Sequence, residues 1–210
     1  WIEPAPYLAK FDGHWYGVPW YYWSFCATIN TTHWSKVGMS VDKVAALSWE
    51  GLADAAKTLH RLGHPVAFAI SQTPDANDIL YPLLWSFGAR TVDEKGDVVL
   101  DSHETARAIE YVRDLFQYMP RDILAWDDGS NNRYLLTGLG SWSNNPPSIW
   151  AAAKLDKLPI ADQFDHVPLP RGPKGHFRTA GSYTCGVWNF SENIDLAKDL
   201  IRFLLRPENF

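Results

Sequence analysis

The sequence of 210 residues contains only two cysteines, two methionines and seven histidines. Cys26 and Cys185 form neither a CxxC pair nor a spacing typical of metal ligands, which argues against a disulfide-rich scaffold and a thiolate zinc site. We expect both thiols to be buried and unbonded, and a single disulfide is the alternative in an oxidising compartment. The histidines are scattered along the chain, and we expect neither a metal nor a cofactor.

Excess positive charge and long apolar runs are also missing. The formal net charge is −5 and the isoelectric point is about 5.8, so the composition gives no support to nucleic-acid binding. No run approaches the roughly 18 apolar residues of a transmembrane helix. No GxSxG motif is present, and the carboxylate pairs Asp75/Asp78 and Asp127/Asp128 stand at expected helix starts, where acidic residues serve as caps. We therefore expect no enzymatic activity; a carbohydrate-active enzyme is a less favoured alternative.

Aromatic residues are what the sequence has in quantity: 11 Trp, 9 Tyr and 10 Phe. Most of them must form the hydrophobic core, because each ring is a large apolar side chain. A surplus of Trp and Tyr also suits a sugar-binding site, since the flat C–H faces of sugars stack on aromatic rings while their hydroxyls need polar partners. The composition thus favours a carbohydrate ligand without locating its site.

The aromatic residues concentrate in the segment 11–30, FDGHWYGVPWYYWSFCATIN. β-branched and aromatic residues favour a strand, whereas Pro19 has no N–H to donate and is typical of an edge or a crossing point. We interpret the segment as a strand that crosses between two lobes near Pro19. The rings after the proline are expected ligand contacts, with burial in the core as the alternative: Trp20, Tyr21, Tyr22 and Trp23.

Helical and strand patterns alternate along the rest of the chain, which predicts an α/β fold. Helical spacing of apolar residues, N-cap residues and terminal glycines predict helices over 33–37, 49–62, 74–87, 102–119, 127–136, 145–155 and 194–205. Asp101 and Glu104 are expected to form a capping box for the fourth of these. Short apolar runs between turn signals predict strands over 66–70, 138–144, 166–169 and 183–190, and a hairpin over 91–100.

Polar residues stand at two of the expected helix starts. Asn77 and Asp78 follow a strand, and Asn144, Asn145 and Ser148 lie between a strand and the next helix. Side chains and free N–H groups both point outward at a helix N-terminus, so we expect ligand contacts there; helix capping is the alternative for the first pair. A further polar group is interpreted as a solvated helix start: Asp127, Asp128, Asn131 and Asn132.

Five short motifs follow one another in an order that indicates one protein family. The first is DGHWYGVP at 12–19, with Asn30 after it. The second is SWEGL at 48–52, and the third spans 87–105 with Gly88, Gly96 and LDS at 100–102. The fourth is LTGLGSW at 136–142. The fifth is PLPRGPKG at 168–175, followed by Gly181, Ala197 and Lys198. Together they resemble the family 1 extracellular solute-binding proteins, the sugar-binding components of ABC importers to which maltose-binding protein belongs. The resemblance covers nearly the whole chain.

This resemblance implies a fold like that of type II periplasmic binding proteins, in which two α/β lobes are joined by hinge-crossing strands. It implies that 1–22 is a partial first lobe with a hinge strand, 23–167 a nearly complete second lobe, and 168–210 a return to the first lobe. The N-terminal part of the first lobe and the C-terminal part of the family chain would be missing. Ligand capture would close the lobes about the crossing strands.

The resemblance also implies a function, namely capture of a sugar or related polyol in the inter-lobe cleft and its delivery to an ABC permease in the membrane. Because the family uses the corresponding loop beside the ligand, it adds Gly181, Ser182 and Tyr183 to the expected contacts, with a place in the strand core as the alternative for Tyr183. In the family a carboxylate often stands where Trp23 stands here, so we do not expect a shared specificity.

For the whole protein we expect a monomer in the periplasm or outside the cell, and a membrane-anchored lipoprotein is the alternative. A glycan-binding sensor on the same fold is the alternative function, because it would share every one of these sequence features.

Overall fold

The computed structural model describes residues 5–209, so the first four residues of the expected segment 1–22 and Phe210 lie outside the described residues. The chain divides into two compact units. Unit 2 is Phe25–Thr179, and unit 1 consists of the residues before Phe25 together with those from Ala180 onward.

A three-stranded antiparallel sheet lies in unit 2, in the order β5–β4–β6. Its strands are β4 (Cys26–Asn30), β5 (Trp142–Asn145) and β6 (Phe164–Val167). Successive residues of a strand point to opposite faces, and Ala27 and Ile29 of the central strand face the main hydrophobic core.

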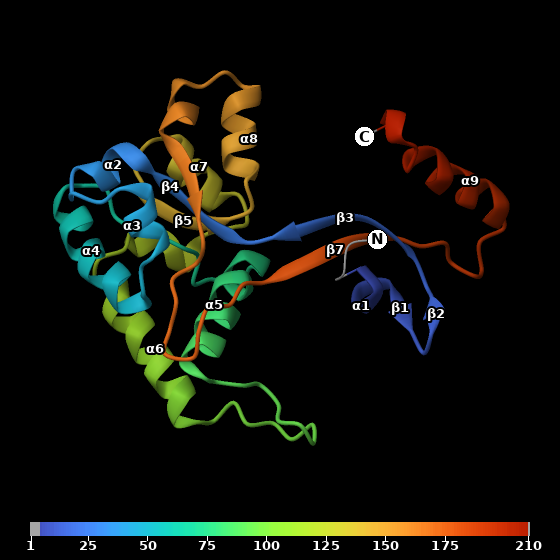
Figure 1. The fold of residues 1–210 in the computed structure, drawn as a ribbon, viewed down its shortest axis with the longest axis horizontal. Coiled ribbons are helices and arrows are strands. Elements are labelled where there is room, and N and C mark those ends of the chain that lie inside the picture. Colours follow the sequence, from blue (N-terminus) through green and yellow to red (C-terminus); the bar gives the residue numbers. More distant parts are fainter. Residues whose placement is uncertain (1–4, 210) are drawn as a thin grey trace. The chain divides into compact units, whose positions relative to one another are not determined.

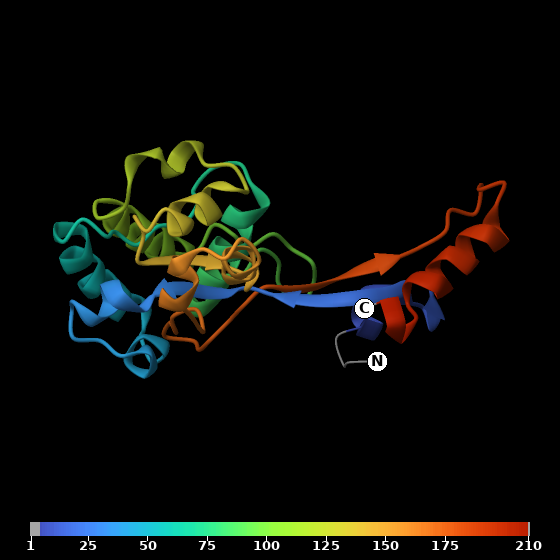
Figure 2. The same ribbon diagram turned by 90° about the horizontal axis from the view of Figure 1, so that it is seen from above.

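Helices surround this sheet (Figures 1 and 2), with α2 and α4 on one side of it and α7 and α8 on the other. The helices of unit 2 are α2 (Thr31–Ser35), α3 (Val41–Ala45), α4 (Trp49–Arg61), α5 (Pro74–Phe87), α6 (His103–Phe116), α7 (Ser130–Leu136) and α8 (Ser148–Leu155), with the 3-10 turns η1 (Arg121–Ala125) and η2 (Pro159–Gln163). A second apolar cluster includes Leu135, Ile149 and Phe164.

Three fully buried tryptophans fill the main core: Trp34, Trp49 and Trp142. A buried indole N–H needs an acceptor, and Trp34 Nε1 donates to the carbonyl of Ser141 at 2.8 Å. Trp49 Nε1 donates to Ser86 Oγ, also at 2.8 Å. Part of the aromatic surplus is therefore core, as the composition predicts.

Unit 1 is built on an antiparallel ladder of β3 (Val18–Ser24) with β7 (Ala180–Cys185). The remaining elements are α1 (Ala5–Ala9), the short pair β1 (Lys10–Phe11) and β2 (His14–Trp15), α9 (Ile194–Leu204) and η3 (Pro207–Asn209). The turn between β1 and β2 holds Asp12 and Gly13 at φ of 47° and 80°, the left-handed region that Asp-Gly turns favour.

The break in the segment 11–30 lies at Phe25 and not at Pro19. Pro19 is buried inside β3, opposite Thr184, and the register shifts between Pro19 and Tyr21. Such a bulge accommodates a residue without an N–H donor. The chain enters unit 2 at Phe25, whose N–H donates to Thr179 O at 3.1 Å. The boundary between the two units therefore follows Pro19 by several residues, and the crossing between the lobes of a complete receptor stays a prediction.

The return passage also differs in place from the expected one. Residues 168–179 lie in unit 2, and the chain re-enters unit 1 at Ala180. How these units correspond to the lobes of a complete receptor stays a prediction.

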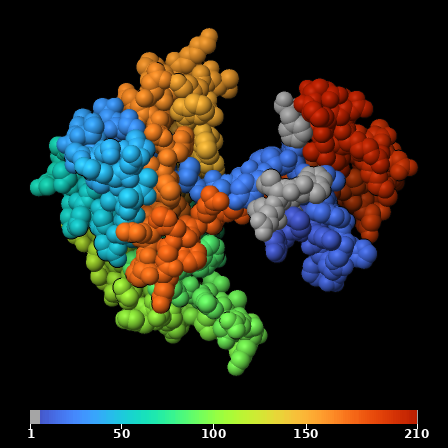
Figure 3. Space-filling model, viewed as in Figure 1, coloured from blue at the N-terminus to red at the C-terminus, as the bar shows by residue number. Residues whose placement is uncertain are grey.

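Several expected elements have different bounds or types. In the segment 66–70 the first four residues are buried, but the segment forms only one bridge, from Val66 to Trp142. The hairpin over 91–100 is reduced to a bridge between Val92 and Val98; Val98 is 80% exposed, because this connection projects from unit 2 (Figure 3, green) and packs on no sheet.

The expected capping box at Asp101 and Glu104 is also wrong by one residue. Ser102 is the N-cap of α6, and its hydroxyl accepts a hydrogen bond from Thr105 N–H.

No helix within residues 5–209 is both long and apolar enough to cross a membrane. Cys26 and Cys185 are unbonded, and both are half-buried instead of fully buried as expected. They belong to different units.

Candidate functional site

Seven of the expected ligand contacts lie on the β3–β7 ladder of unit 1, which we call the aromatic ladder. Its register places three pairs directly opposite each other: Tyr21 and Tyr183, Tyr22 and Ser182, and Trp23 and Gly181. Trp20 lies at the bulge, between Pro19 and Tyr21. The antiparallel pairing therefore brings together residues that are far apart in the sequence.

Exposed rings dominate one part of this ladder. Tyr21 stacks on Tyr183 across the strands, with the ring centroids 4.8 Å apart and an interplanar angle of 24°. Trp20 meets Tyr21 edge to face at 5.5 Å. The exposed fractions are 42% for Trp20, 47% for Tyr21 and 57% for Tyr183, so none of these three rings is a core residue of the described chain.

Trp23 occupies the space beside Gly181, its opposite residue. A Cβ at Gly181 would lie 2.6 Å from the indole Cζ2 of Trp23, so the ring packs against the glycine backbone. Ser182 donates its hydroxyl to the carbonyl of Tyr183 at 3.2 Å. The glycine is thus required for the half-buried position of Trp23.

The other five expected contacts lie in unit 2: Asn77, Asp78, Asn144, Asn145 and Ser148. Here the first turns of α5, α7 and α8 meet the end of β5 through side-chain hydrogen bonds, which we call the amide network. Asn144 and Asn145 are the last residues of β5 and are 0% and 5% exposed.

Asn131 is the central residue of the amide network and is 2% exposed. Its Nδ2 donates to Asp75 Oδ2 at 2.7 Å and to Asn144 O at 3.1 Å. Its Oδ1 accepts from the N–H of Asn132 at 2.8 Å. A single buried amide therefore connects α5, α7 and β5.

Asn145 extends the network to α8. Its Nδ2 donates to Asn132 Oδ1 and to Ser148 Oγ, both at 2.9 Å. Its backbone carbonyl accepts from the Cys26 thiol at 3.1 Å. Burial raises the pKa of that thiol to about 11, so Cys26 is a protonated donor at neutral pH and not a nucleophile.

Two carboxylates border the network with raised pKa values. Burial, together with the charges of Asp128 and Asp78, raises the pKa of Asp75 to about 6, against the hydrogen bond from Asn131. The pKa of Asp78 is also raised, chiefly by burial. Asn144 donates its Nδ2 to the carbonyl of Asp75, and its own Oδ1 is buried without a partner among the described residues.

The structure thus brings Asn144, Asn145 and Ser148 into one network, whereas Asn77 is exposed on the first turn of α5. The interpretation of Asn131 and Asn132 as a solvated helix start is wrong, because both belong to the network. No local sequence signal distinguishes these two residues, because their partners Asp75 and Asn145 lie far from them in the sequence.

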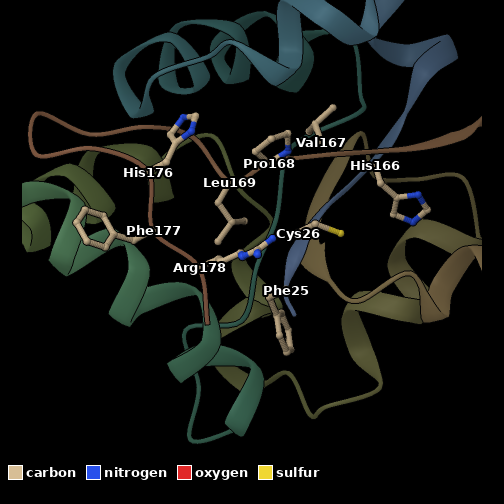
Figure 4. Close-up of a pocket in the computed structure, with 9 residues that line it drawn as sticks. All are labelled: Phe25, Cys26, His166, Val167, Pro168, Leu169, His176, Phe177 and Arg178. Atoms are coloured by element: carbon tan, nitrogen blue, oxygen red, sulfur yellow. The ribbon is translucent and has the colours of Figure 1, made fainter. Parts of the chain in front are cut away.

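The cavity in Figure 4 lies elsewhere in unit 2 and has a volume of about 450 Å³. Cys26 and Arg178 lie near its middle, while His166 and Phe177 lie on opposite sides of it. None of the expected ligand contacts lines it.

Metal binding has no support in the part of the chain that the structure describes, which contains no group of three or more His, Cys, Asp or Glu able to hold an ion. His60 and His64 are four residues apart, but His64 stacks on His33 at 3.6 Å. The two candidate regions offer ring faces, amide and hydroxyl groups, and the carboxylates of Asp75 and Asp78.

Comparisons with known proteins indicate one family. Residues 1–209 match the family model described as bacterial extracellular solute-binding protein. An arabinooligosaccharide-binding protein of Halalkalibacterium halodurans is 24% identical over 213 residues, which cover 96% of this chain and 46% of the relative. A probable ABC transporter-binding protein of Deinococcus radiodurans is 25% identical over 119 residues, or 56% of this chain and 28% of that protein.

Solved structures give the same result for the fold. The maltose-bound MalE3 of T. maritima matches with a TM-score of 0.89 and 25% identity, covering 99% of this chain and 55% of that one. A solute-binding protein of Thermotoga lettingae bound to α-D-tagatose matches with a TM-score of 0.83 and 17% identity, covering 100% and 54%. The predicted α/β fold of the type II periplasmic binding proteins is confirmed, and the chain spans about half the length of these relatives.

Proposed function

The chain belongs to the bacterial extracellular solute-binding protein family, and on that premise we propose that it serves in the substrate-binding component of an ABC importer. Its ligand is a sugar or related polyol. The observation that carries this proposal is the exposed stack of Tyr21 on Tyr183, with Trp20 beside it.

The aromatic ladder supports a sugar because its rings are exposed in the folded chain. These three side chains keep 42% to 57% of their surface accessible, which leaves ring faces free for a ligand. Sugar C–H faces stack on such rings and release the water that covers them.

The amide network supports a hydroxyl-bearing ligand. Ser148 Oγ accepts from Asn145 and keeps its own hydrogen to donate, and the buried Asn144 Oδ1 is without a partner among the described residues. An unsatisfied buried acceptor costs about 1–3 kcal/mol, and such groups call for a functional reason. Our proposed ligand contacts are the twelve expected residues, with Asn131 and Asp75 holding the amides in place.

The complete protein would deliver its ligand to a membrane permease, act outside the cytoplasmic membrane as a monomer, and catalyse no reaction. Relatives point the same way: H. halodurans has an arabinooligosaccharide-binding protein, and another structural neighbour, from Agrobacterium vitis, contains D-mannitol. The alternative, a glycan-binding sensor, shares the site and differs only in its partner.

A thermal-shift screen of the full-length protein tests the proposal with monosaccharides, oligosaccharides, polyols and glycerol phosphates. A ligand at 100 times its Kd stabilises the folded state by about 2.7 kcal/mol, which is a readily measured rise in Tm. Stabilisation by sugars or polyols is the expected result. A screen in which glycerol phosphates alone stabilise the protein, or in which nothing does, would contradict it.

A further inference from the structure

The exposed face of α5 carries aromatic rings, where a surface helix ordinarily carries charge. Between Ile79 and Phe87 the helix has no charged residue. Tyr81 is 38% exposed and Trp85 is half-buried, and their rings stack at 5.7 Å with an interplanar angle of 25°. Asn77 lies one turn earlier on the same face, so the stripe begins at an expected ligand contact.

A cavity of about 550 Å³ lies at the other end of this stripe, a volume typical of ligand pockets. Trp85 and Phe177 form its aromatic side, with ring centroids 6.4 Å apart and planes at 61°. Phe177 keeps 37% of its surface exposed. Polar and small residues complete the lining: Gly88, Ala89, Arg90, Glu104 and Lys174.

The three charged residues of this lining have hydrogen-bonding capacity to spare. Among residues 5–209, neither Arg90, Glu104 nor Lys174 takes part in an ion pair. Two of the side chains meet over Gly88, where a Cβ would lie 3.2 Å from Lys174 Cγ and 3.5 Å from Glu104 Cγ. The site therefore offers two donors and one acceptor beside two ring faces.

The loop that carries Lys174 is held against α5. The N–H of Lys174 donates to Ser86 O at 2.9 Å, and the N–H of Arg171 donates to Leu47 O at 3.1 Å. Gly172 and Gly175 close the turn through an antiparallel bridge. A lining fixed in this way loses little conformational freedom when a ligand binds.

We propose that this cavity is a subsite for an outer sugar residue of an oligosaccharide. The rings suit a sugar face, and the donors of Arg90 and Lys174 together with the acceptor of Glu104 suit its hydroxyls. From Asn77 to Gly88 the helix rises roughly 16 Å at 1.5 Å per residue. Only a ligand of several sugar residues therefore reaches both ends of the stripe. This inference rests on the proposed function and gives its substrate class.

Calorimetric titration of the full-length protein with maltose and maltohexaose, and with arabinobiose and arabinohexaose, tests the subsite. The test variant is Trp85→Ala. Trp150→Ala is the control, because Trp150 is another indole of unit 2, 40% exposed on α8, that does not line the cavity. Arg90→Gln is a second test variant at an exposed position, where folding is not at risk.

We expect Trp85→Ala to weaken hexasaccharide binding roughly tenfold and Arg90→Gln to weaken it by a smaller factor. Disaccharide affinity should stay unchanged in both, and Trp150→Ala should match the wild type for every probe. Equal hexasaccharide affinity in wild type and both test variants would overturn the subsite alone. If the wild-type protein binds no hexasaccharide, the subsite is overturned, while the proposed function is decided separately by the thermal-shift screen.

Discussion

The aromatic ladder of unit 1 exposes apolar rings, whereas the amide network of unit 2 buries polar side chains. The ladder leaves rings such as Tyr183 exposed, since a ring face needs no hydrogen-bond partner. The network buries amides such as Asn131, which is tolerable only because nearly every polar atom has a partner. Substitutions in the network should therefore affect folding first, and substitutions of the exposed rings should affect binding first.

Asn131→Ala should have the largest effect on stability. It removes the donor to Asp75 and Asn144 and leaves a half-buried carboxylate without that hydrogen bond, so we expect a loss of about 3 kcal/mol in the free energy of unfolding. Urea unfolding followed by tryptophan fluorescence measures it. The exposed Asn77→Ala is the control and should change stability by less than about 0.5 kcal/mol; equal losses in the two variants would contradict the network.

Gly181→Ala should cause the next largest loss of stability, because it displaces the Trp23 ring within the aromatic ladder. The new Cβ would lie 2.6 Å from the Trp23 ring, and such overpacking costs about 1–3 kcal/mol. Gly186→Ala is the matched control in unit 1, because its Cβ would meet only Tyr16 O at 3.5 Å. Hydrogen exchange of β3 amides should rise in the first variant and not in the second.

The stability of the amide network should depend on pH through Asp75. The folded-state pKa of Asp75 is raised from 3.8 to about 6, so its contribution is most favourable below pH 3.8 and is lost as the pH rises through 6. Asp75→Asn should therefore be more stable than the wild type at pH 7.5, with an advantage that shrinks towards pH 4. An advantage that is constant over this range would contradict the assignment.

His33, in the same unit, should make stability change with pH in the opposite direction to Asp75. Burial, then the neighbouring His64, lowers the pKa of His33 from 6.5 to about 4, although the bond to Gly140 O opposes the shift. Its contribution is full above pH 6.5 and is lost as the pH falls towards 4, and Lys36, which contacts His64 Nε2, adds a further positive charge. We expect His33→Gln to lose less stability between pH 6.5 and 4.5 than the wild type does, as measured by thermal unfolding.

The sequence predicted the elements whose signals are local. Ser48 caps α4, and Gly88 ends α5 at a φ of 98°, because N-cap hydroxyls and left-handed glycines act within a few residues. Pro19 was expected to break the strand, but a proline can also sit at a bulge inside a strand, as it does in β3. That choice depends on the pairing with β7, which no local pattern shows.

The candidate site was predicted in part for the same reason. Asn144 and Asn145 were found because they end a strand, whereas Asn131 resembled any polar residue at a helix start. Its burial depends on Asp75, 56 residues away in the sequence. Long-range partners of this kind are beyond the reach of spacing arguments.

The central claim is that exposed rings and buried amides both serve one sugar-binding function, and titration calorimetry of the full-length protein tests it most directly. The best ligand of the sugar screen would be titrated into the wild type, Tyr183→Ala, Ser148→Ala and the control Trp188→Ala, an exposed ring of unit 1 that lies outside the ladder. We expect roughly tenfold weaker binding for Tyr183→Ala, a loss of about 1 kcal/mol in binding free energy for Ser148→Ala, and no change for Trp188→Ala. Wild-type affinity in either Tyr183→Ala or Ser148→Ala would contradict the claim.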